Sequence, residues 1–290
     1  MSSLARRFDP WPTLRGAPIA LPQLLAILAL VTLSAAEGGF PLEHWAPAAV
    51  LVALLLIVSI VALPAGRRRS KSSRAAIVLI AAFAVWTAAS ITWADDLGAA
   101  AVASTRTALF AATFVLFARW RHAPRTASVV MTVLTAGLGI LAWGVLFKLR
   151  GADSLDDWFL YDRLLEPIGY VNAGAAFWGI GFFLSVGLLG GSLPAAPRII
   201  GALSVVPAGA LSLLCLSRGG LLSGAIVIIL LLLVLPGRAR NGAAFAIAAL
   251  GLLVAEPALL DVGAAVRDNA VNAPDLLHTA MVRVMGGAFV

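Results

Sequence analysis

Long apolar runs dominate the chain, and each is long enough to form a helix that crosses a bilayer. A hydrocarbon core about 30 Å thick requires roughly 20 helical residues. Nine such runs lie at residues 19–36, 45–64, 75–94, 98–118, 127–148, 170–190, 199–216, 220–236 and 242–260. Their apolar residues are continuous and do not alternate with polar ones, so the pattern predicts helices and not the strands of a membrane barrel. We therefore expect an all-α, polytopic integral membrane helical bundle with about nine transmembrane helices.

Composition excludes a soluble globular protein. Apolar residues make up 61% of the chain and charged residues 12%, whereas a soluble domain has about 45–50% and about 25%. Lipid must therefore solvate much of the surface. The first run leaves one alternative open, because Arg6, Arg7 and Arg15 precede it and small residues end it, as in a cleaved signal peptide. The eight runs that follow favour an uncleaved first helix.

The distribution of charge predicts the orientation in the membrane. Cytoplasmic segments of membrane proteins are enriched in Lys and Arg near the helix ends. With the N-terminus in the cytoplasm, the inner segments contain 14 of the 21 basic residues and only Asp9 of the 14 acidic residues. Those basic residues are at positions 6, 7, 15, 67, 68, 69, 71, 74, 119, 121, 125, 198, 238 and 240. The net charge of +7 therefore indicates anchoring at an anionic bilayer surface and no nucleic-acid partner.

This orientation divides the chain into three parts. Residues 1–18 form a cytoplasmic segment, residues 19–260 the transmembrane domain, and residues 261–290 the start of an extracytoplasmic segment in a multi-pass protein of the cytoplasmic membrane. The outer loop at 149–169 contains five acids and three clustered aromatic residues. Aromatic residues favour the membrane interface, so we expect this loop on the outer membrane surface, with a short interfacial helix as one form. The three histidines are far apart, which argues against a metal site.

Arg218 is the first candidate for a binding site, because it stands between two apolar runs at an outer boundary where positive charge is scarce. A guanidinium there can bind phosphate through two charge-assisted hydrogen bonds, or it can reach toward lipid head groups without a specific ligand. Arg163 is a second candidate cation, with a local pair to Glu166 as the structural alternative.

Three further polar residues have two interpretations each. Asn172, at the start of the sixth run, can bind a polar ligand, but a helix cap or an interhelical hydrogen bond is the stronger interpretation. Arg106 lies inside the fourth run, where a functional charge and an arginine that reaches the interface are equally favoured. His278 could act as a general base, although an isolated histidine usually has no such role.

Two segments resemble the core signature of the O-antigen ligase and O-antigen polymerase superfamily. Residues 163–172 (RLLEPIGYVN) lead into a run that begins AGAAFWGIG, and residues 211–220 (LSLLCLSRGG) lead into an aliphatic run. Residues 87–97 (TAASITWADDL) are also similar to a segment that precedes a span in that family, so the resemblance covers roughly residues 75–240. The Ser-Arg-Gly turn is short, and its specificity comes from its order and spacing after the first segment.

The resemblance implies a GT-C-like fold and a metal-independent glycosyltransferase without a cofactor. Members of the superfamily move a glycan from an undecaprenyl diphosphate carrier to an acceptor glycan, lipid or protein outside the cytoplasmic membrane. Arg163 and Arg218 match the arginines that bind the diphosphate, and Asn172, Ser217 and Gly219 occupy supporting positions. The family's catalytic histidine lies in a large periplasmic loop; His278 is the candidate here, although the family pattern around it is absent.

The sequence departs from the family at its C-terminal end. Family members continue with the large loop and further spans, whereas this sequence ends at Val290, about 30 residues into the expected loop. We therefore expect an enzyme that is incomplete at its C-terminus, with a non-catalytic fragment or assembly subunit as the alternative. A transporter is a third interpretation, which predicts polar groups near the middle of several spans and paired broken helices. The ligase interpretation predicts that Arg163 and Arg218 face one cavity on the outer side.

Overall fold

The computed structural model describes residues 17–62, 70–119, 124–152, 154–234, 237–268 and 273–288. The first 16 residues and the basic residues at 67–69 and 121 lie outside these ranges. The described residues are predominantly helical, which confirms the predicted all-α class. They form two compact units, one of Met1–Leu30 with Phe40–Val130 and the other of Val31–Gly39 with Met131–Val290.

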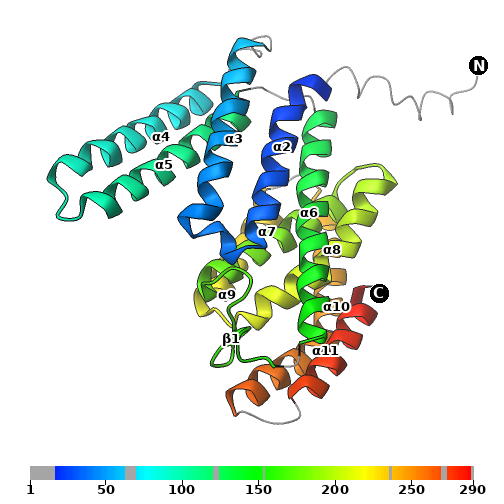
Figure 1. The fold of residues 1–290 in the computed structure, drawn as a ribbon. Helices are drawn as coiled ribbons and strands as arrows, with labels where there is room; N and C mark the ends of the chain where they lie inside the picture. Colours follow the sequence, from blue (N-terminus) through cyan, green and yellow to red (C-terminus); the bar gives the residue numbers. More distant parts are fainter. Residues whose placement is uncertain are drawn as a thin grey trace, which may run out of the picture. The chain divides into compact units, whose positions relative to one another are not determined.

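Unit 1 is built from apolar helices. Its helices are α3 (Leu42–Val61), α4 (Lys71–Ala89), the 3-10 helix η3 (Ser90–Trp93) and α5 (Leu97–Ala118), with parts of α2 (Ala17–Ser34) and α6 (Pro124–Arg150). Helices α4 and α5 lie side by side (Figure 1), and α3 packs on α5. The side chains of Ser70 and Asp96 cap the N-termini of α4 and α5, because each accepts a hydrogen bond from a backbone N–H three residues on.

The surface of unit 1 is that of a membrane protein. No residue of α4 is buried, and large apolar side chains such as Leu79, Phe83 and Trp86 are exposed. Water would solvate such a helix poorly, whereas lipid solvates it well.

The predicted apolar runs all fall on helices α2 to α10. Seven of these helices are long and apolar enough to cross a membrane: α3, α4 with η3, α5, α6, α7 (Val171–Gly190), α8 (Ala195–Leu214) and α10 (Arg238–Arg267). Two shorter apolar helices, Ala20–Ser34 within α2 and α9 (Arg218–Val234), accompany them. The chain is therefore a multi-pass membrane protein; the number of nine spans stays a prediction.

Unit 2 contains the larger core, in which small residues let the helices approach closely. It comprises the rest of α6, helices α7 to α10, helix α11 (Ala273–Ala288), the 3-10 helix η2 (Glu37–Gly39) and two short strands. Helices α7 and α8 form its most extensive pair, and Gly181 packs against Ala208 between them. Helices α10 and α11 lie side by side (Figure 1) and cross where Gly251 meets Gly287. Such small-residue contacts are typical of helix packing in membranes.

The loop predicted at 149–169 contains a β-hairpin, so the interfacial helix considered for it is wrong. Strands β1 (Phe159–Leu160) and β2 (Arg163–Leu164) pair antiparallel around a turn of Tyr161 and Asp162. Phe159 and Leu164 are opposite each other and buried in the core, while Leu160 and Arg163 lie on the other side. Burial of one face of the hairpin offsets the entropy of ordering it, which an isolated pair of short strands could not do.

The C-terminal end is helical beyond the last predicted span. Helix α10 continues to Arg267, and α11 follows it and packs on α10 and α8. Helix α11 buries one stripe, formed by Leu277, Ala280, Met281 and Val284. Their spacing of three and four residues places them on one face of the helix. The segment expected as the start of a loop is therefore, where described, part of the helical core.

Candidate functional site

Ser217 fixes the turn between α8 and α9. Helix α8 ends just before Leu216, which has a left-handed backbone with φ of 43°. The hydroxyl of Ser217 then accepts a hydrogen bond from the backbone N–H of Gly220 at 3.1 Å, and its carbonyl accepts one from the N–H of Leu221 at 2.9 Å. Ser217 is thus the N-cap of α9, and the N–H groups of the first helical turn carry the positive end of the helix dipole.

Asn172 and Ser217, predicted as supporting residues, are in direct contact. The Ser217 hydroxyl donates to Oδ1 of Asn172 at 2.9 Å, across 45 residues of sequence. Nδ2 of Asn172 donates to the hydroxyl of Tyr170 at 3.1 Å, and Tyr170, not Asn172, is the N-cap residue of α7. The hydrogen bond between Ser217 and Asn172 joins the start of α7 to the start of α9, as the interhelical interpretation of Asn172 predicted.

Arg218 is the first residue of α9, and its side chain is exposed. Within the described residues, no hydrogen bond or ion pair engages its guanidinium. Gly219 beside it is also exposed, so no side chain covers the first turn at that position. A free guanidinium next to the N-terminus of a helix suits an anionic ligand, because both contribute positive potential.

Arg163 lies in β2 with its side chain 44% exposed. Its Nε is 3.7 Å from a carboxylate oxygen of Asp162, so its ionic partner is Asp162 and the predicted local pair with Glu166 is absent. A pair at this distance and exposure contributes little to stability. The guanidinium therefore keeps donors for a ligand.

The segments that carry Arg163 and Arg218 meet at Gly263 of α10. A Cβ atom at Gly263 would lie 3.1 Å from the carbonyl oxygen of Asp162 and 3.6 Å from a methyl group of Leu216. The two arginines therefore belong to one end of unit 2, which also holds the start of α7 and the end of α8. We call this the arginine end.

Arg267 is a third arginine at this end, and no sequence pattern singles it out. It is the last residue of α10, and its Nη1 lies 4.0 Å from the same Asp162 carboxylate that pairs with Arg163. The apolar run that predicts this helix ends at residue 260, so the position of Arg267 could not be inferred from the sequence.

Glu166 follows the hairpin and has an altered acidity. Burial raises the pKa of its carboxyl above the ordinary value, and the nearby Glu37 carboxylate raises it further. A hydrogen bond from the N–H of Gly38 to the carbonyl of Pro167, at 2.8 Å, holds the segment of Glu37 next to the segment of Glu166.

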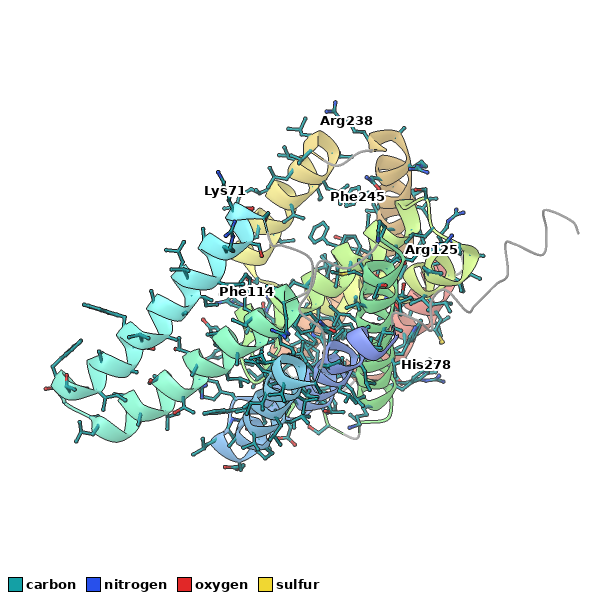
Figure 2. All side chains as sticks on the ribbon, turned by 90° about the horizontal axis from the view of Figure 1, so that it is seen from above. Lys71, Phe114, Arg125, Arg238, Phe245 and His278 are labelled. Atoms are coloured by element: carbon teal, nitrogen blue, oxygen red, sulfur yellow. The ribbon has the colours of Figure 1, made fainter. Side chains whose placement is uncertain are left out.

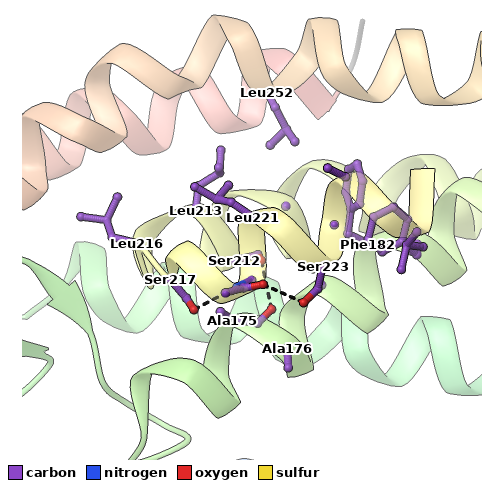
Figure 3. Close-up of a pocket in the computed structure, with 18 of the residues that line it drawn as sticks. Ala175, Ala176, Phe182, Ser212, Leu213, Leu216, Ser217, Leu221, Ser223 and Leu252 are labelled. Carbon is purple, nitrogen blue, oxygen red and sulfur yellow. Dashed lines mark hydrogen bonds between the residues drawn. The ribbon is translucent and has the colours of Figure 1, made fainter. Parts of the chain in front are cut away.

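A cavity of about 940 Å³ lies among α7, α8, α9 and α10. Its walls are mainly apolar, and Figure 3 shows Leu252 projecting from α10 toward the side that contains Leu213 and Leu221. Phe245, another wall residue, projects from α10 (Figure 2). The polar side chains that line the cavity are those of Asn172, Ser212, Ser217, Ser223 and Glu256. Gly219 also lines it, whereas Arg163 and Arg218 do not, so the cavity adjoins the arginine end without containing either guanidinium.

Neither His278 nor Arg106 lines this cavity. His278 is exposed on α11, and Figure 2 shows it projecting from the edge of the bundle. Arg106 belongs to unit 1, where its Nη2 donates to the carbonyl of Phe40 at 3.1 Å and its guanidinium stacks 4.5 Å from the centre of the Phe40 ring. This geometry gives Arg106 a structural role that ties α5 to the start of α3.

The described residues contain no group of three or more His, Cys, Asp or Glu side chains that could hold a metal ion. Comparisons of the chain with protein-family models, with curated proteins and with solved structures return no match. The resemblance to the O-antigen ligase superfamily therefore stays a prediction.

Proposed function

We propose that the chain is a membrane glycosyltransferase similar to O-antigen ligases and polymerases, which moves a glycan from undecaprenyl diphosphate to an acceptor for cell-surface polysaccharide synthesis. The observation that supports this proposal is the arginine end. Two partly or fully exposed arginines, Arg163 and Arg218, come from segments that meet at Gly263, next to the N-terminus of α9 and an apolar cavity. Positive charge beside an apolar cavity suits a lipid with an anionic head group.

The proposed reaction breaks the bond between the anomeric carbon of the glycan and the diphosphate oxygen. An acceptor hydroxyl forms the new bond to that carbon and gives up its proton to a general base, for which His278 is the candidate. The diphosphate leaves with the bonding electron pair. Negative charge grows on the diphosphate as it leaves, so guanidinium groups fixed beside it stabilise the transition state more than the ground state. The asymmetry of charge supports a cytoplasmic N-terminus and an extracytoplasmic arginine end.

The test is glycan transfer by the purified protein in liposomes, from an undecaprenyl-diphosphate glycan to an acceptor. Loss of a hydrogen bond to a charged group amounts to about 1.5–3 kcal/mol, so Arg218→Ala should lower transfer by roughly 10- to 100-fold. Arg240→Ala is the matched control, because Arg240 is an exposed arginine in the first turn of α10, at the other end of that helix. Equal activity of the two variants, or no transfer and no donor binding by the wild type, would refute the proposal.

A further inference from the structure

Glu256 differs from every other polar side chain that lines the cavity. Ser212 donates to the carbonyl of Ala175 at 3.0 Å (Figure 3), and Ser223 donates to the carbonyl of Gly219 at 2.6 Å. Asn172 and Ser217 bond each other, as described above. For Glu256, no hydrogen bond or ion pair is found within the described part of the chain. Among the described residues that line the cavity, Glu256 is thus the polar side chain for which no hydrogen-bond or ionic partner is found.

Glu256 lies inside the apolar part of α10. It precedes Gly263, the residue at the arginine end, by seven positions, which corresponds to about 10 Å along a helix. Large apolar side chains surround it on the cavity wall, including Leu252, Leu259 and Leu260. A carboxylate at such a position is costly without a partner, and acidic residues in membrane helices are usually paired or functional.

None of the described residues that line the cavity is Lys, Arg or His, so no cationic side chain of the lining pairs with Glu256. A polyprenyl chain supplies no positive charge either, and it has no hydrogen-bond donor. The polyprenyl chain of undecaprenyl diphosphate therefore leaves Glu256 without a partner. A ligand that matches both Glu256 and the apolar walls has a cationic group attached to an apolar chain. A primary ammonium meets this requirement better than a hydroxyl, since charge-assisted hydrogen bonds are about twice as strong as neutral ones.

We propose that this cavity binds an amphiphile with a single long alkyl chain and an ammonium group, and that Glu256 recognises the ammonium. The alkyl chain of the ligand occupies the apolar space between α9 and α10, and its ammonium group donates a hydrogen bond to the Glu256 carboxylate. This inference does not depend on the glycosyltransferase proposal, although such an amphiphile would compete with any lipid chain in the same space.

The test compares three probes with the same sixteen-carbon chain: hexadecylammonium, hexadecanol and hexadecyl phosphate. Each is titrated into the full chain in an uncharged detergent at pH 7, and bound probe is counted by native mass spectrometry. The protein has a net charge of +7, so non-specific attraction favours the phosphate. A preference for the ammonium therefore has to come from a local acid. Because hydrogen bonds to charged groups contribute about 1.5–3 kcal/mol, we expect one hexadecylammonium to bind at least about tenfold more tightly than hexadecanol.

Three variants locate the origin of this preference. Glu256→Gln should reduce it to less than about threefold, and Glu256→Asp should keep part of it, because the charge remains but is one methylene further away. Asp261→Asn is the control, since Asp261 is an exposed acid on the same helix that does not line the cavity, and it should keep the full preference. Equal affinity of the wild type for all three probes would overturn the proposal, as would an unchanged preference in Glu256→Gln or an equal loss in Asp261→Asn. If Glu256→Gln does not fold, a preference in Glu256→Asp that is as large as in the wild type overturns it.

Discussion

Ser217 makes two side-chain hydrogen bonds through one hydroxyl, so Ser217→Ala removes both at once. The first caps α9, and loss of an N-cap costs about 1 kcal/mol. The second reaches Asn172 on α7, and interhelical hydrogen bonds in membrane proteins contribute about 0.6 kcal/mol on average. We therefore expect Ser217→Ala to lower the free energy of unfolding by about 1.5–2 kcal/mol.

The assay is reversible unfolding by SDS in mixed micelles, followed by circular dichroism. Ser223→Ala is the matched control: Ser223 is on the same helix, is exposed and bonds only a carbonyl of its own helix, so its loss should change stability by less than about 0.5 kcal/mol. A double-mutant cycle with Asn172→Ala separates the two bonds, and the expected coupling between Ser217 and Asn172 is about 0.6 kcal/mol. Additive effects, or a loss in Ser217→Ala no larger than in Ser223→Ala, would refute this account of the turn.

Three further outcomes are expected. Gly287→Val should destabilise the helical core by about 2 kcal/mol or more, because its side chain would enter the α10 backbone, whereas Gly286→Val should have little effect, since open space surrounds that position; equal melting temperatures would contradict the observed crossing. The raised pKa of Glu166 means that the unfolded chain releases this proton first, so stability falls as pH rises from about 4.3 toward the folded pKa. Glu166→Gln should therefore gain stability relative to wild type above that range and not below it, and Glu37→Gln should lower the pKa of Glu166 in a carboxyl titration by NMR. His278→Asn should lower glycan transfer and leave donor binding unchanged if the histidine is the base that the resemblance implies; full transfer by this variant would remove His278 from the reaction.

The membrane helices were predictable from sequence because hydropathy acts over whole helices. Each predicted run lies on one helix of the structure, except that the run at 75–94 covers α4 and η3, and α10 extends past its predicted end. Helix α11 was not predicted, because residues such as Asp275 and His278 lower its average hydropathy. Its buried positions nevertheless repeat every three to four residues, as in an amphipathic helix. The hairpin at 159–164 was also not predicted, since strands of two residues have no periodicity of their own and form only where a core covers one face.

The contacts within the candidate site could not be predicted from the sequence. Asn172 and Ser217 were each selected as candidates, yet their hydrogen bond spans 45 residues and depends on how α7 and α9 pack. The shared carboxylate of Asp162 and the position of Arg267 depend in the same way on the hairpin reaching α10. Glu256 was overlooked because a single acid hardly changes the average of an apolar run, and only the cavity shows that it faces a ligand-sized space.

The central claim is that Arg163 and Arg218 bind one diphosphate, and a double-mutant cycle on carrier binding tests it most directly. The affinity of undecaprenyl diphosphate, without a glycan, is measured in nanodiscs of uncharged lipid for the wild type, Arg163→Ala, Arg218→Ala and the double variant. The account predicts that each single variant weakens binding by at least about tenfold. It also predicts that the double variant loses less than the sum of the two free-energy changes, because both arginines share one anion. If both Arg218→Ala and Arg163→Ala bind undecaprenyl diphosphate with the affinity of the wild type, the arginine end is not a diphosphate site.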